Sequence, residues 1–176
     1  MSSGPGGNGN GNGNGNGTKR NAELAFQALG KWLEEDDWHP VRMEGMLAFR
    51  TGFAGENARV VCVAEIRPQQ QFLFYALVPN KVPEERRVPV SEALTRANWG
   101  LRIGNFELDF TDGEIRFKSS LDFEGELLTP ALIRNTVYPA VATLDHYLPA
   151  IMAVAYGGKD PAEAIAEVEK PEPSDS

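Results

Sequence analysis

"NWGLRIGNFELDFTDGEIRFK", residues 98–118, carries the clearest local structural signals in the chain. Gly100 closes an apolar helical pattern, and glycine is the usual residue just past a helix C-terminus. Asp112-Gly113 then separates two runs in which apolar and charged residues alternate, as in a hairpin closed by a two-residue type I′ turn. The stretch therefore predicts a helix end, a break and an antiparallel hairpin.

A two-residue loop fixes the register that we expect for this hairpin. Apolar side chains then meet on one face and opposite charges on the other, and a slip of one residue would destroy both sets of pairs. The register is therefore well specified, and folding alone explains most of the stretch. The expected pairs are Phe110 with Ile115, Leu108 with Phe117, Asp109 with Arg116, and Glu107 with Lys118.

Residues 41–78 upstream are rich in Val, Phe, Ile and Tyr, and they predict three antiparallel strands after a short lead-in strand at 41–44. In the strands at 60–66 and 72–78 both faces are apolar. We therefore expect that water touches neither face of the central sheet. Helices could cover one face, and a second subunit or a bound segment of another protein could cover the other.

Amphipathic patterns on either side of these strands predict two helices. Residues 21–36 carry apolar side chains at three- and four-residue spacing, and Pro40 prevents continuation of that helix. Residues 89–100 form the second pattern, with Pro89 in its first turn, where proline is tolerated.

The last long helical pattern begins at Thr129-Pro130, as N-cap and first helical residue, and stops at Gly157-Gly158. Pro139 and Pro149 lie inside it, so we expect kinks or one break. A short helix capped by Asp160 could follow. Together the patterns predict an α+β fold of two layers, an antiparallel sheet with helices in the order α-β-β-β-α-β-β-α.

Composition divides the 176 residues into one domain with two tails. Residues 1–18 are almost entirely Gly and Asn with nothing to bury, so they predict a disordered tail. Residues 169–176 predict a second, acidic disordered tail. The single folded domain is expected to span residues 19–168.

The net charge of −8 disfavours nucleic acid and anionic membranes as partners, since phosphate-binding proteins concentrate positive charge on one face. No apolar run reaches the ~18 residues that a membrane span needs, and the N-terminus lacks a signal-peptide pattern. The single cysteine, Cys62, excludes an intramolecular disulfide. These features predict a cytoplasmic protein.

Motifs of catalysis are absent from the sequence. It contains no phosphate-binding loop, no H-E-x-x-H metal motif and no G-x-S-x-G nucleophile motif. His39 and His146 lack sequence partners for a metal or general-base role, and Cys62 in mid-strand fits buried packing better than a nucleophile. We therefore expect a protein that is not an enzyme, with no catalytic residues, no metal site and no cofactor.

The leading hypothesis is a protein-binding module whose contacts come from the sheet and the second helix. Each candidate contact residue has an alternative place in the intramolecular core. A second hypothesis is a small-molecule sensor with a pocket between sheet and helices, anchored by Tyr138, Tyr147 or Arg134. The candidate contact residues are Phe72, Phe74, Tyr75, Leu94, Ala97 and Trp99.

Several segments resemble the YbjN family of bacterial proteins. They are "LGKWLEEDDW" (29–38), "VPEERR" (82–87), the stretch from "ALTRANWG" through "AVAYGG" (93–158) and "DPAEAI" (160–165). The resemblance extends over roughly residues 21–168, and residues 96–122 are its most specific part. Pro89 departs from the pattern, and it is expected to shorten the second helix.

The resemblance implies a sensory transduction regulator with a fold like that of type III secretion chaperones. Those chaperones are small, acidic, cytoplasmic homodimers that bind extended client segments. The family has no motif of catalytic residues to transfer. With the residues, the resemblance predicts a non-enzymatic cytoplasmic protein-binding module, a regulator or chaperone-like adaptor in bacterial signalling, with a homodimer and an unidentified protein client as partners.

Overall fold

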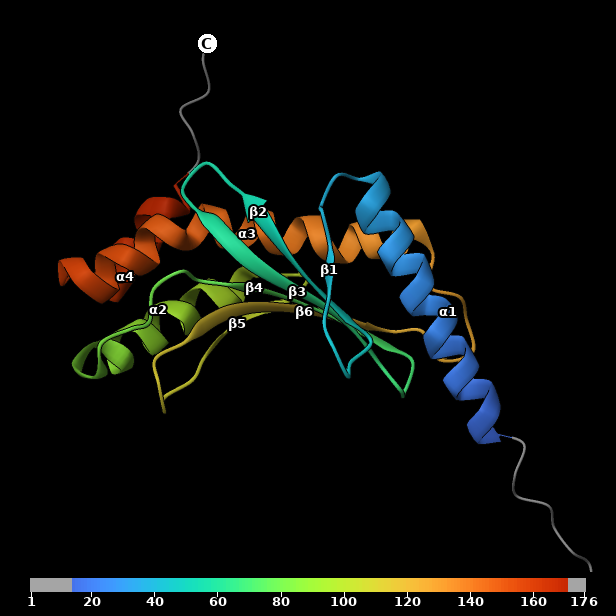
Figure 1. Ribbon diagram of the computed structural model, residues 1–176. Helices are drawn as coiled ribbons and strands as arrows, with labels where there is room; N and C mark the ends of the chain where they lie inside the picture. Colours follow the sequence, from blue (N-terminus) through green and yellow to red (C-terminus); the bar gives the residue numbers. More distant parts are fainter. Residues whose placement is uncertain (1–13, 171–176) are drawn as a thin grey trace, which may run out of the picture.

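The computed structural model describes residues 14–170 and consists of one antiparallel sheet with helices (Figure 1). The six strands lie in the order β1-β2-β3-β4-β6-β5. This confirms the α+β class. The strands are β1 (Val41–Arg42), β2 (Ala48–Ala54), β3 (Arg59–Arg67), β4 (Gln71–Leu77), β5 (Asn105–Leu108) and β6 (Ile115–Asp122).

The helices follow the expected order along the chain, with a short 3-10 helix, η1 (Glu84–Arg86), immediately before α2. Pro89 falls in the first turn of α2, where its missing N–H costs no helical hydrogen bond, so that helix is not shortened. The α-helices are α1 (Asn14–Glu35), α2 (Arg87–Gly100), α3 (Pro130–Gly157) and α4 (Pro161–Val168).

Helix α1 begins at Asn14, seven residues before the expected start at residue 21. It therefore takes in residues 14–18, which the glycine-rich composition assigned to a disordered tail. Residues 169–170 of the second expected tail are described and are ordered against the helices, with Glu169 N–H donating to the Ile165 carbonyl at 3.1 Å. Residues 1–13 and 171–176 lie outside the described residues.

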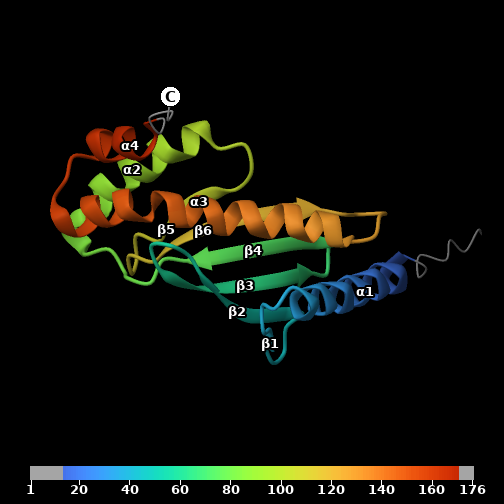
Figure 2. The same cartoon turned by 90° about the horizontal axis from the view of Figure 1, so that it is seen from above.

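The long helix α3 lies along one face of the sheet, with α1 crossing near β2 and β3 on the same side (Figures 1 and 2). Helices α2 and α4 pack beside α3, next to the edge formed by β5. The core lies between this helical layer and the sheet face that carries Cys62, Phe74 and Phe117, all of which are fully buried. Helices α1 and α3 thus cover one face of the sheet, α2 and α4 extend this layer past β5, and no helix of residues 14–170 covers the other face.

Helix α3 starts and stops where the sequence predicts. The Thr129 hydroxyl accepts the N–H of Leu132 at 3.3 Å, and Gly158 ends the helix with φ +68°. The helix is continuous through Pro139 and Pro149, so of the two expected outcomes, kinks or one break, the break is wrong. Each proline removes one backbone donor, and the buried apolar stripe on both sides of it keeps the helix on the sheet.

The register predicted for the β5–β6 hairpin is wrong by two residues. Residues 109–114 form a longer loop instead of the two-residue turn, with Asp109 N–H donating to the Glu114 carbonyl at 2.9 Å. A two-residue shift keeps every side chain on its expected face, but it moves Phe110 into the exposed loop. The observed pairs are Leu108 with Ile115, Glu107 with Arg116, Phe106 with Phe117 and Asn105 with Lys118.

Two kinds of contact stabilise this longer loop. The Asp109 carboxylate accepts the N–H of Thr111 at 2.7 Å. Gly113 has φ +80° and lies against the backbone of Val82, whose N–H donates to the Gly113 carbonyl at 2.8 Å. A side chain at position 113 would collide with Val82, so glycine is required there for both its φ and its size.

Candidate functional site

The uncovered face of the sheet is the first candidate for a functional surface. Side chains alternate between the two faces of β3 and β4, so one set meets the helices and the other set points away from them. No helix among residues 14–170 covers the second set (Figure 1). This set, which we call the open face, contains Val61, Val63, Leu73, Tyr75 and Leu77.

The open face is apolar but in contact with solvent. Val61 is 37% exposed, and the other four residues are half-buried. The expectation that water touches neither face of the central sheet is therefore wrong for the single chain, because every helix packs on the other face. An antiparallel sheet with one solvated face usually carries polar residues there, so five neighbouring apolar side chains are unusual.

A charged cluster borders the open face on β5 and β6. The guanidinium of Arg116 lies over the ring of Tyr75, 4.5 Å from its centroid, and its Nε donates to Glu107 at 2.7 Å. Lys118 donates to the same carboxylate. Partial burial raises the pKa of Glu107, but the hydrogen bonds from Lys118 and Arg116 outweigh it, so the net shift is below the ordinary value.

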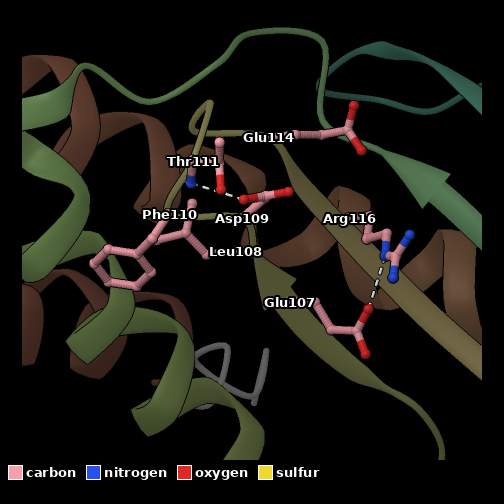
Figure 3. A pocket seen from close by; sticks show the side chains of 7 residues that line it. All are labelled: Glu107, Leu108, Asp109, Phe110, Thr111, Glu114 and Arg116. Atoms are coloured by element: carbon pink, nitrogen blue, oxygen red, sulfur yellow. Dashed lines mark hydrogen bonds and ion pairs between the residues drawn. The ribbon is translucent and has the colours of Figure 1, made fainter.

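A hollow of about 520 Å³ lies next to this cluster, at the end of the β5–β6 hairpin (Figure 3). Glu107 and Arg116 point toward one another at one end of it, and Phe110 lies at the other. Asp109 and Glu114 add two more carboxylates to the lining. No group of three or more His, Cys, Asp or Glu residues in the described chain could hold a metal ion. The hollow has a carboxylate-rich wall without a nucleophile and base in contact.

A second hollow, of about 330 Å³, lies on the open face itself. Leu73 and Tyr75 form its apolar part, while Arg116 and Lys118 supply positive charge. This arrangement could accept an apolar side chain or a small anion with an apolar part.

The candidate residues named from the sequence separate into two groups. Phe72, Phe74 and Ala97 are fully buried and Leu94 is 3% exposed, so all four belong to the core in this structure. Tyr75 lies on the open face, and Trp99 is 93% exposed at the end of α2. The structure therefore does not bring the six residues together on one surface.

Four residues of the open face were not named as candidates from the sequence: Val61, Val63, Leu73 and Leu77. Alternation along the strands places them with Tyr75, and that signal was present in the sequence. What the sequence did not show was which of two equally apolar faces the helices cover.

The polar anchors proposed for a sensor pocket already have partners or lie in solvent. The Tyr138 hydroxyl donates to Asp36 at 2.6 Å, and the Tyr147 hydroxyl donates to Glu169 at 2.7 Å. Burial, followed by the hydrogen bond to Glu169, raises the pKa of Tyr147 to about 12. Arg134 is exposed on α3.

The cysteine and the two histidines lie either in the buried core or in solvent. Cys62 is fully buried in β3, and burial raises the pKa of its thiol to about 12, which suppresses the reactive thiolate. His39 lies in solvent with its Nε2 3.7 Å from Asp37. His146 is exposed on α3, with its ring edge-on to Tyr147.

Comparison with known proteins bears on how this surface is interpreted. The model of the YbjN family, described as "Putative bacterial sensory transduction regulator", matches residues 26–153. The chain belongs to the YbjN family. The matched segment contains all six strands and α2, so the family assignment covers the sheet and its open face.

A solved structure agrees with this assignment. The crystal structure of YbjN from E. coli, described as "a putative transcription regulator", aligns with a TM-score of 0.57 at 14% sequence identity. The alignment covers 75% of this chain and 92% of that chain. At that identity the likeness shows the fold alone. No curated protein matches the chain.

The YbjN family is described as a regulator and not by a reaction. Within residues 14–170, no helix has both the length and the apolar character needed to cross a membrane. Neither finding names a partner, so the partner has to be inferred from the surface.

Proposed function

We propose that this YbjN-family chain is a non-enzymatic, cytoplasmic protein-binding module that acts as a regulator or chaperone-like adaptor in bacterial signalling. The observation that carries the proposal is the open face, where Val61, Val63, Leu73, Tyr75 and Leu77 form one apolar surface. Contiguous apolar patches on otherwise charged proteins mark interaction sites. The family description as a sensory transduction regulator supports the same conclusion.

The simplest form of this proposal is a homodimer in which the open face is buried between two subunits, with a further protein client bound elsewhere. A stable interface buries about 800 Å² per partner, which is the scale of one face of a small sheet. The family resemblance implies a fold like that of type III secretion chaperones, which form homodimers, and this expected likeness favours the dimeric form by analogy only.

The test is the solution mass of the full chain, measured by light scattering across a dilution series. Wild-type protein should form a dimer that dissociates on dilution, and Leu73→Asp should shift the equilibrium toward monomer by at least tenfold, because a buried charge weakens an apolar interface. Val88→Asp is the matched control, because Val88 is 70% exposed on α2 and lies off the open face.

The two possible failures of this test have different meanings. A dimer that is equally sensitive to Leu73→Asp and Val88→Asp would move the interface away from the open face. A strictly monomeric wild-type protein that also captures no partner at native levels would refute the protein-binding proposal.

The second candidate function is a small-molecule sensor. The hollow over Leu73 and Tyr75, with Arg116 and Lys118 beside it, favours a small organic anion with an apolar part. A ligand that binds only the folded state raises the thermal midpoint. A metabolite library screened by thermal shift distinguishes the two functions, since a hit lost in Arg116→Gln would support the sensor.

A further inference from the structure

Only part of the outer edge of β2 is covered by another strand. β1 pairs with β2 at two positions, Val41 with Arg50 and Arg42 with Phe49, and β2 then continues to Ala54 (Figure 2). Beyond Arg50, the edge of the sheet has no neighbouring strand among the described residues. Unpaired edges are where an extended segment of another chain can add to a sheet.

The direction of the backbone groups along this edge follows from the bonds at both ends of β2. Leu47 accepts from Ile66, and Gly55 donates to Ala58, so the odd-numbered residues between them bond to β3. The even-numbered residues face outward, and Ala48 does so by accepting from Met43 N–H at 2.9 Å. At Gly52 and Ala54, the outward peptide groups have no hydrogen-bond partner across the edge within residues 14–170.

An apolar hollow of about 540 Å³ follows this free edge. It is lined by backbone and side chains of residues 50–54 on one side, and by Trp38, His39 and Val41 on the other. Gly52 has no side chain to fill the hollow. The space beside it is free, since a Cβ added there would meet only the Val60 carbonyl, at 3.7 Å. The hollow is therefore continuous with the unpaired backbone.

The aromatic wall of the hollow is held in place by bonds within the chain. Trp38 stacks on Phe53 with ring centroids 5.8 Å apart, and its indole Nε1 donates to Asp36 at 2.9 Å. The Thr51 hydroxyl donates to the Trp38 carbonyl. The residues on both sides of Trp38 have positive φ, which few non-glycine residues adopt. These contacts fix the position of Trp38 on this side of the hollow.

Two arginines give the same edge a positive charge. Arg50 lies on β2, and Arg59 lies opposite Ala54 on β3, so both point to the open-face side with Gly52 between them. Neither has an ion-pair or side-chain hydrogen-bond partner in the described part of the chain. In a protein of net charge −8, unpaired positive charge beside an apolar hollow indicates an acidic ligand.

We propose that the edge of β2 at residues 52–54 receives an extended segment of a partner protein in which acidic and apolar residues alternate. The segment pairs with the outward peptide groups of Gly52 and Ala54. Because side chains alternate along a strand, its acidic residues face Arg50 and Arg59, and its apolar residues face the Trp38 wall. The inference rests on the proposed protein-binding function, and it specifies the chemistry of the partner.

The opposite edge of the sheet is blocked to such a segment at its centre, at Phe106. Asn98 of α2 accepts the N–H of Phe106 at 2.8 Å and donates to the Phe106 carbonyl at 3.1 Å. The side-chain amide thus takes the place of a neighbouring strand on β5. A second copy of this chain is also a poor occupant of the β2 edge, because edge-to-edge pairing would bring the arginines of both copies together.

The experiment measures fluorescence anisotropy of a short labelled peptide that alternates valine and glutamate, titrated with the full chain. A peptide that alternates valine and lysine is the control ligand. Arg59→Glu and Arg50→Glu should each weaken binding of the glutamate peptide about tenfold, since each replaces an attraction by a repulsion. Arg102→Glu is the matched control variant, because Arg102 is exposed and lies near the opposite edge.

A second measurement tests the backbone pairing. Amide hydrogen exchange should slow at Gly52 and Ala54 when the glutamate peptide is bound, and Ala54→Pro, which removes one outward donor at an edge, should weaken binding. Thermal unfolding verifies that this variant is folded. If Ala54→Pro is unfolded, the exchange measurement on wild-type protein decides the point alone.

Several outcomes would overturn the inference. They are no binding up to about 1 mM protein, equal binding of both peptides, equal effects of Arg59→Glu and Arg102→Glu, or unchanged exchange at Gly52 and Ala54. Each of these leaves the protein-binding function intact, provided that the open-face variant Leu73→Asp still changes the solution mass. Failure of the solution-mass test with a successful peptide titration would reject only the dimer.

Discussion

The turn between β2 and β3 gives a stability prediction that can be worked out from geometry. The carboxylate of Asp145 on α3 accepts the N–H groups of Glu56 at 2.9 Å and Asn57 at 3.0 Å, which holds this turn on the helix. Gly55 lies so close that an added Cβ would collide with the carboxylate, with Oδ2 of Asp145 at 2.9 Å and Oδ1 closer still. Gly55→Ala must therefore push the carboxylate away from the turn.

The expected magnitude follows from the hydrogen bonds that are lost. Bonds to a charged group contribute about 1.5–3 kcal/mol each, and because the turn is exposed, water replaces much of what they supply. Gly55→Ala and Asp145→Ala should therefore each lower the free energy of unfolding by about 2 kcal/mol. In the Asp145→Ala background, alanine at position 55 meets no carboxylate. The φ of residue 55 lies outside the left-handed region. In this background Gly55→Ala should therefore change the free energy of unfolding by close to nothing.

Urea unfolding of the four proteins in this double-mutant cycle, followed by tryptophan fluorescence, tests the argument. The double variant should be about as stable as Asp145→Ala alone, with unchanged m-values. Gly52→Ala, in the adjoining strand β2, is the control, because its Cβ would make an ordinary contact at 3.7 Å. Additive losses in the double variant would refute the reasoning, because they would mean that position 55 is not limited by the carboxylate.

Three further predictions concern single side chains. The Cys62 thiol, with a pKa raised to about 12 by burial, should resist maleimide at about pH 8 until urea unfolds the chain; rapid labelling of folded protein would contradict its burial. The lowered pKa of Glu107 means that its stabilisation is present above the ordinary carboxyl pKa and is lost as pH falls through the folded-state value. Glu107→Gln should therefore lower the free energy of unfolding at neutral pH and remove this part of the acid-side loss, whereas an unchanged urea-unfolding pH profile would argue against it. The buried hydroxyl of Ser119 has no partner within residues 14–170, so Ser119→Ala should leave the thermal midpoint unchanged or raise it, and a loss above about 1 kcal/mol would reveal a missed hydrogen bond.

The helix ends were predictable because they depend on chemistry within a few residues. Thr129-Pro130 and Asp160-Pro161 cap α3 and α4 as expected, and the Asp160 carboxylate accepts the N–H groups of Ala162 and Glu163 at 2.9 and 3.0 Å. The start of α1 was not predictable in the same way. Its glycine-rich first residues have poor helix propensity, and the repeated Asn-Gly pairs offer several equivalent capping residues, so none marks the start of the helix.

The hairpin register could not be obtained from the local turn signal. Asp112-Gly113 does provide the positive φ at position 113, but the loop around it is stabilised by Val82, about thirty residues earlier in the chain. The carboxylate of Asp112 is also engaged by Lys81 from that same segment. A contact between distant segments therefore decided between a two-residue turn and a longer loop, and alternation was preserved in either case.

The sequence predicted that a second apolar face would exist, but not which residues would form it. The sequence shows that both faces of β3 and β4 are apolar, and this led to the expectation of an external partner. Phe72 and Phe74 lie in the core, where α3 packs on β4, whereas Tyr75 of the same strand lies on the open face, so side-chain size alone does not choose the face. Strand periodicity defines two sets of side chains, but only the packing of the helices determines which set is buried.

The two edges of the sheet show how this fold can be selective for one kind of partner. At β5, one amide of Asn98 satisfies both backbone groups of Phe106, so a new strand could not pair there without displacing it. At β2, a glycine and an alanine leave the backbone accessible, and Arg50 and Arg59 remain without acidic partners in the described chain. If the free edge of β2 had no binding role, charge reversal at Arg50 or Arg59 would change peptide affinity no more than charge reversal at Arg102. A larger loss of peptide affinity from charge reversal at Arg50 or Arg59 than at Arg102 would therefore distinguish a binding edge from an edge that is simply uncovered.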